Sequence, residues 1–75
     1  MIKPIIYTTP SCTYCTTIKN WFRDHQVEYQ EVTVGVDIPS DVFIDKTGSM
    51  GVPVTEINGE FIVGFQPDRL SQLIA

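Results

Sequence analysis

The first half of the chain changes from a strand-like to a helix-like pattern of apolar positions. The run "PIIYT" at 4–8 is compact, apolar and rich in β-forming residues, which predicts a strand buried on both faces. The segment "TPSC" breaks this run, and helical spacing over 12–25 then predicts a helix. Its apolar face carries Ile18, Trp21, Phe22 and His25. The following "VEYQEVTV" at 27–34 predicts a second strand.

A short helix is predicted over 38–48. Pro39 suits the first turn of such a helix, and Gly48 suits its C-terminal cap. Two apolar, β-prone runs within 52–63 flank Asn58-Gly59, the favoured pair for a tight hairpin turn. The second half therefore predicts a helix followed by a β-hairpin.

The chain ends with a pattern typical of an amphipathic helix. Pro67 fits the first helical position, and Asp68 complements the positive end of the helix dipole. The apolar face of this helix carries Leu70, Leu73 and Ile74.

The predicted order is strand, helix, strand, helix, hairpin, helix. The first strand-helix-strand unit should be parallel with a right-handed crossover, and the hairpin adds two antiparallel strands. We therefore expect one α/β domain over 1–75, with a four-stranded mixed sheet flanked by three helices. This is the minimal thioredoxin-like architecture.

Composition narrows the classes of function. The chain has 75 residues and a net charge of -4, which argues against nucleic acid as a partner, since phosphates call for a basic face. The N-terminal "MIKPIIYTTPSC" is too short and too interrupted by proline to be a signal peptide or a membrane span. We expect a cytoplasmic protein.

Both cysteines of the chain lie in "SCTYCTT", at Cys12 and Cys15. Cys12 falls at the predicted strand-to-helix junction, where unpaired N–H groups and the helix dipole stabilise a thiolate and lower the pKa of the thiol. Cys15 lies one turn further along, on the same side, and should be less exposed than Cys12. Cys12 is therefore the predicted attacking thiol and Cys15 the resolving thiol of a disulfide exchange.

Other interpretations of this cysteine pair remain open. A structural zinc site needs four ligands, and the two cysteines with His25 would have to be completed by a second chain. A permanent structural disulfide would close so small a loop that it would restrain the unfolded chain little. Two incidental cysteines are the third interpretation.

Val52-Pro53 is a second candidate feature. A cis peptide bond at this position would turn the backbone N–H and C=O of Val52 outward beside Cys12. These groups could then pair with an extended substrate, as an added strand would.

Taken together, "YTTPSCTYC", "TGSMGVPV", "INGEFIVGF" and "GFQPDRL" resemble glutaredoxin-like proteins, particularly the NrdH-redoxin branch. The resemblance covers essentially the whole chain. It implies the thioredoxin fold, Cys12 as nucleophile, Cys15 as resolving thiol and Pro53 in the cis form. The substrate-binding residues that we expect are Tyr14, Val52, Pro53, Gly64, Phe65 and Asp68.

The same resemblance leaves two electron donors, glutathione and thioredoxin reductase. Tyr14 matches the tyrosine of the glutaredoxin motif Cys-Pro-Tyr-Cys, whereas Thr13 replaces its proline. Thr9 stands where glutaredoxins commonly have a lysine for glutathione, and Phe65 belongs to a segment of the NrdH-redoxin form. These departures favour thioredoxin reductase.

The resemblance also implies partners. Expected clients are protein or small-molecule disulfides, with ribonucleotide reductase among the proteins, and we expect a monomer without a tightly bound cofactor or metal. The alternative function is a glutathione-dependent iron–sulfur carrier. In that role Cys12 and glutathione would hold a [2Fe–2S] cluster between two chains, and the small Thr13 would be compatible with it.

Overall fold

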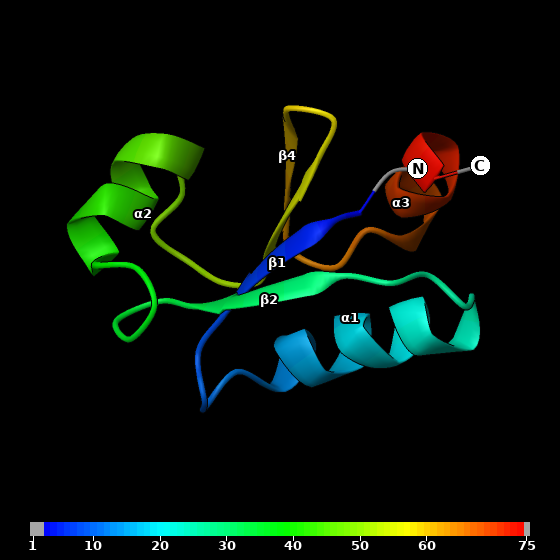
Figure 1. Ribbon diagram of the computed structural model, residues 1–75, viewed down its shortest axis with the longest axis horizontal. Helices are drawn as coiled ribbons and strands as arrows, with labels where there is room; N and C mark the ends of the chain where they lie inside the picture. The colour runs from blue at the N-terminus through cyan, green and yellow to red at the C-terminus, as the bar shows by residue number, and fades with distance from the viewer. Residues whose placement is uncertain (1–2, 75) are drawn as a thin grey trace.

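The computed structural model describes residues 3–74, except for the side chain of Ile74. Four strands form one mixed sheet in the order β2-β1-β3-β4, with β1 parallel to β2 and antiparallel to β3. The elements are β1 (Ile5–Thr8), α1 (Thr13–Asp24), β2 (Gln30–Thr33), α2 (Ser40–Thr47), β3 (Val54–Ile57), β4 (Glu60–Val63) and α3 (Pro67–Ile74). Figure 1 shows α1 and α2 on opposite sides of the sheet. The predicted element order and the four-stranded mixed sheet with three helices are confirmed.

The larger half of the core lies between the sheet and the pair α1 and α3. Alternation along β1 sends Ile6 to this face, where it meets Phe22 of α1 and Leu70 of α3, all buried. Trp21 packs against this core while its indole stacks on the imidazole of His25, with ring centroids 3.9 Å apart. His25, predicted on the apolar face of α1, is exposed to solvent and caps the C-terminus of the helix.

A smaller core lies on the opposite face, under α2. Tyr7 points to this side and packs against Phe43 of α2, with ring centroids 5.4 Å apart. Its hydroxyl donates a hydrogen bond to Glu56 at 3.0 Å, and Lys46 lies 3.7 Å from the same carboxylate. Burial raises the pKa of Tyr7. Tyr7 is thus a core residue that ties α2 to the sheet.

Two predicted elements are shorter than expected. The strand predicted over 27–34 is β2, Gln30–Thr33, because the N–H of Val27 still bonds to the carbonyl of Phe22 at the end of α1. The helix predicted over 38–48 is α2, and Pro39 is its N-cap rather than part of its first turn. The ψ of Pro39, 148°, is extended and cannot belong to a helical turn.

The predicted turn residues behave as expected. Gly48 caps α2 with φ 73°, a left-handed conformation that glycine adopts without steric cost. Asn58 and Gly59 join β3 to β4 with φ values of 53° and 81°, as a type I′ turn requires. Both predictions are confirmed.

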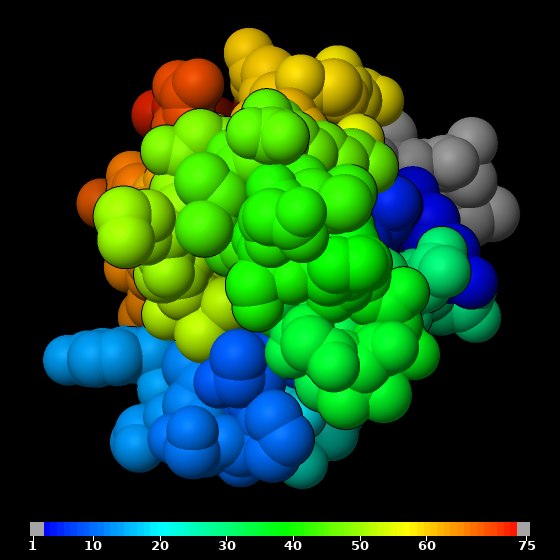
Figure 2. Space-filling model, turned by 90° about the vertical axis from the view of Figure 1, so that its left-hand side faces the viewer, coloured from blue at the N-terminus to red at the C-terminus, as the bar shows by residue number. Residues whose placement is uncertain are grey.

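The strand directions bring four connecting segments to one edge of the sheet. The parallel strands β1 and β2 both end there. Since β3 is antiparallel to both β1 and β4, β3 begins at this edge and β4 ends there. We call the segments 9–14, 34–38, 49–53 and 64–68 the cysteine edge. Figure 2 faces much of it, with the blue segment after β1 beside the yellow-green segment before β3.

Candidate functional site

Cys12 and Cys15 form a disulfide at the start of α1. Cys12 is the N-cap residue of the helix, with extended backbone angles of φ -85° and ψ 113°. Its N–H donates to the carbonyl of Thr9 at 3.2 Å, which closes the turn between β1 and α1. The strand-to-helix junction therefore holds the two sulfurs together.

The two cysteines differ in accessibility. Cys12 is half-buried, whereas Cys15, in the first turn of α1, is only 1% exposed. Cys12 is therefore the more accessible of the two cysteines to an incoming molecule. The predicted difference in exposure is present.

The helix terminus favours negative charge on the sulfur of Cys12. The N–H of Cys15 donates to Cys12 Sγ at 3.1 Å, so the sulfur takes the place of a capping oxygen. The first turn of α1 contains no acidic residue that would oppose a thiolate there. The backbone thus provides a hydrogen-bond donor and a positive partial charge at the sulfur of Cys12, and both favour its thiolate form.

Val52-Pro53 immediately precedes β3 at the same edge, and its peptide bond is cis, as predicted. Pro53 is buried and Val52 half-buried. The carbonyl of Pro53 accepts a hydrogen bond from the N–H of Gly64 at 2.8 Å, which extends the pairing of β3 with β4 beyond Val54. Pro53 and Gly64, two of the predicted substrate-binding residues, are therefore hydrogen-bonded to each other.

The other predicted binding residues also lie at the cysteine edge. Tyr14 is 64% exposed on the first turn of α1. Phe65 is half-buried and packs against the α1/α3 core, and Asp68 is exposed in the first turn of α3. Substrate contact by these residues stays a prediction.

Two exposed apolar residues at this edge were missed by the sequence-based predictions. Val36 is 78% exposed in the turn after β2, and Met50 is 88% exposed before Val52-Pro53. The signal that could have identified them is an apolar side chain within a short connecting segment, where no strand or helix face would bury it.

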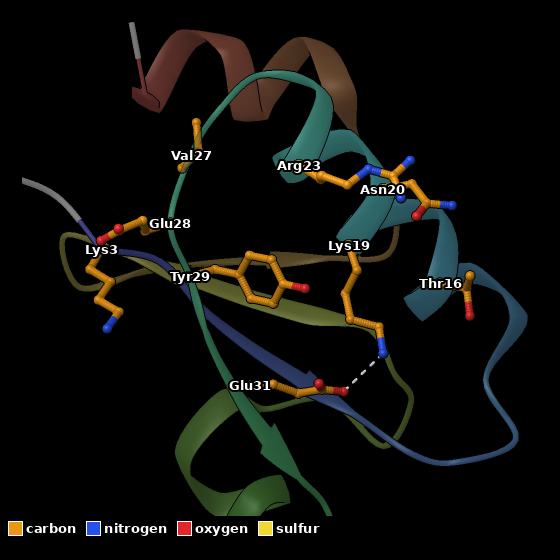
Figure 3. A pocket seen from close by; sticks show the side chains of 9 residues that line it. All are labelled: Lys3, Thr16, Lys19, Asn20, Arg23, Val27, Glu28, Tyr29 and Glu31. Carbon is orange, nitrogen blue, oxygen red and sulfur yellow. Dashed lines mark hydrogen bonds and ion pairs between the residues drawn. The ribbon is translucent and has the colours of Figure 1, made fainter.

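A pocket of about 770 Å³ lies elsewhere, between α1 and β2 (Figure 3). Lys19 and Glu31 form an ion pair in it at 3.1 Å. Its lining residues are Lys3, Thr16, Lys19, Asn20, Arg23, Val27, Glu28, Tyr29 and Glu31. Since neither cysteine lines it, this pocket is separate from the redox-capable pair.

Glu31 links three elements from this pocket. Its carboxylate accepts hydrogen bonds from Thr8 at 2.7 Å and Lys19 at 3.1 Å. The bond from Thr8, followed by that from Lys19, lowers the pKa of Glu31 below its ordinary value of 4.5. Because the pKa is lower in the folded state, ionised Glu31 stabilises the fold above pH 4.5. This stabilisation is lost as the pH falls through the pKa of Glu31 in the folded protein.

Replacing Glu31 with glutamine is therefore expected to lower the free energy of unfolding at pH 7. The loss should be less than about 1 kcal/mol because the pair is partly exposed and screened. The difference from wild type should shrink below pH 4.5, as measured by urea unfolding across pH. Glu28→Gln, which removes an exposed carboxylate of the same pocket, is the control, and an equal effect of both variants would contradict the role of Glu31.

Within residues 3–74, His, Cys, Asp and Glu form no group of three that could hold a metal ion. A cluster shared between two chains stays a prediction. No helix in the described part of the chain is long and apolar enough to cross a membrane.

Comparisons with known proteins agree with this geometry. An uncharacterised glutaredoxin-like 8.6 kDa protein from the rubredoxin operon of Clostridium pasteurianum is 33% identical over 75 residues, covering 99% of this chain and 97% of that one. The glutaredoxin-like protein NrdH of Lactococcus lactis is 25% identical over 71 residues, covering 91% of this chain and 94% of that one.

A solved structure confirms the predicted thioredoxin-like fold. The thioredoxin-like protein BC3987 superposes with a TM-score of 0.83 at 29% identity, over 96% of this chain and 100% of that one. The family model for glutaredoxin matches residues 5–62, which include both cysteines and Val52-Pro53. The chain therefore belongs to the glutaredoxin family of the thioredoxin superfamily.

Proposed function

We propose that this chain is a thiol-disulfide oxidoreductase that reduces protein or small-molecule disulfides with Cys12 and Cys15. The observation that carries the proposal is the disulfide between an accessible N-cap cysteine and a buried cysteine one turn further along α1. Membership of the glutaredoxin family supports it.

The reduced protein starts the reaction. The thiolate of Cys12 attacks one sulfur of the substrate disulfide, because it is the more accessible of the two cysteines. A mixed disulfide forms between Cys12 and that sulfur, and the other substrate sulfur leaves as a thiolate. The N–H of Cys15 and the positive end of α1 stabilise the negative charge on Cys12 before the attack.

The second step releases the product. The sulfur of Cys15 loses its proton and attacks the sulfur of Cys12, which expels the remaining substrate sulfur as a thiolate. The products are a fully reduced substrate and the Cys12–Cys15 disulfide, the state in which the structure is found. An external donor of two electrons must then restore the two thiols.

Thioredoxin reductase is the proposed donor, and the cytoplasm is the proposed compartment. Support comes from Thr9, which lies at the place of the glutathione-binding lysine of typical glutaredoxins, and from the similarity to NrdH of Lactococcus lactis. By the resemblance to NrdH-redoxins, ribonucleotide reductase is among the proposed clients.

The donor can be tested by turnover with two reducing systems. Disulfide reduction is measured with NADPH, thioredoxin reductase and the protein, and separately with NADPH, glutathione reductase and glutathione. We expect efficient turnover with thioredoxin reductase and little with glutathione. Efficient turnover only with glutathione would overturn the proposed donor and leave the chemistry of Cys12 and Cys15 standing.

A further inference from the structure

Apolar side chains project from three separate segments of the cysteine edge. Tyr14, Val36 and Met50 follow β1, follow β2 and precede β3, respectively, and each is more than half exposed. Single exposed apolar residues are ordinary, but a group around a functional site is typical of an interaction surface. We call these three residues the apolar rim.

The charges at this edge have one sign. The segments 9–14, 34–38, 49–53 and 64–68 contain no lysine or arginine, although the chain has five such residues. They contain two carboxylates, Asp37 and Asp68, both exposed. An anionic substrate would therefore find no cationic side chain in these segments.

The five lysine and arginine residues of the chain lie outside the cysteine edge, and several of them form ion pairs there. Lys46 lies 3.7 Å from Glu56, and Arg69 lies 3.7 Å from Glu60 at the start of β4, the opposite end of that strand. The remaining three line the pocket between α1 and β2, as Figure 3 shows; they are Lys3, Lys19 and Arg23.

On these observations we propose that the apolar rim is a docking surface for a protein whose disulfide is flanked by apolar and basic residues. The inference rests on the proposed function and names its substrate class. Tyr14 and Met50 supply the large, adaptable apolar area that interfaces favour, while Asp37 and Asp68 attract basic residues and repel acidic ones. A small disulfide that carries carboxylates, such as glutathione disulfide, uses neither feature.

Three disulfide probes test the proposal in single-turnover reactions with the pre-reduced protein. Two are peptide disulfides with the same core, one flanked by leucine and arginine and the other by leucine and glutamate. Glutathione disulfide is the third. We expect the arginine peptide to react at least about tenfold faster than the glutamate peptide at low salt, and this ratio to fall as salt is added.

The rim itself is tested by the double variant Val36→Ser, Met50→Ser. It should slow the reaction with the arginine peptide by about five- to tenfold, because apolar anchors carry much of the binding energy at interfaces. Its rate with glutathione disulfide should change less than about twofold, since the proposal assigns that probe no contact with Val36 or Met50. Val42→Ser, which alters an exposed valine of α2 outside the cysteine edge, should match wild type.

The contribution of the two carboxylates is tested separately, by two double variants. Asp37→Asn with Asp68→Asn should reduce the preference for the arginine peptide, whereas Asp41→Asn with Asp45→Asn, on α2, should keep it. Equal rates with the two peptides, or equal slowing of all three probes by the rim variant, would overturn the docking surface alone. Failure of the wild-type protein to reduce any probe would overturn the proposed function and the docking surface together.

Discussion

Replacing Cys12 with serine should abolish disulfide reduction, with kcat/KM falling by at least about a thousandfold. A serine hydroxyl is not ionised at neutral pH and cannot form the mixed disulfide, and the buried Cys15 is inaccessible to the substrate. The measurement is reduction of a protein disulfide under saturating reductant. Cys15→Ser is the matched control, because it makes the same change one turn along α1 and keeps the attacking sulfur.

The two serine variants should differ in how they fail. Cys12→Ser should show neither turnover nor a stable adduct, whereas Cys15→Ser should complete the first step and stop there. Both should remain folded by circular dichroism, since Cys12 lies at a helix end and the disulfide closes only a short loop. Full activity of Cys12→Ser would show that the nucleophile is wrongly assigned.

The largest expected effect on stability comes from Phe22→Ala. Phe22 is 0% exposed and packs its ring against Trp21 and Tyr29, with centroids 5.3 and 5.5 Å away. Removing this ring should cost about 3–5 kcal/mol, through lost apolar burial and the cavity left behind. In a domain of this size such a loss is a large part of the total free energy of unfolding.

Urea unfolding monitored by circular dichroism measures this effect. Phe22→Leu is the control, because it keeps an apolar side chain and should cost less. The expected order of stability is wild type, Phe22→Leu, then Phe22→Ala. A loss below about 1 kcal/mol in Phe22→Ala would contradict the burial of Phe22 in the core between the sheet and the helices α1 and α3.

The sequence predicts most of the fold because strong local signals agree with one another. Helical spacing identifies α1, and Asn58-Gly59 fixes the hairpin through the positive φ values that these residues tolerate. An error occurs where hydrogen bonding at the end of a helix delays the start of the next strand. The strand expected from Val27 begins only at Gln30, because the N–H of Val27 donates to the carbonyl of Phe22 at the end of α1.

The candidate site is predictable in part. Cys12 and Cys15 are identifiable from spacing and from their position at a strand-to-helix junction. Val36 and Met50 could be identified only as apolar residues of connecting segments, because the extent of their exposure follows from turns whose conformation the local pattern does not specify. Their position beside the cysteines depends on strand directions, which only the assembled sheet brings to one edge.

Trapping the covalent intermediate tests the central assignment most directly. Reduced Cys15→Ser and reduced Cys12→Ser are each mixed with a peptide disulfide, quenched with acid, and mapped by mass spectrometry. We expect a mixed disulfide at Cys12 in Cys15→Ser and almost none at Cys15 in Cys12→Ser, because Cys15 is buried. A mixed disulfide that forms readily at Cys15 but not at Cys12 would contradict the assignment.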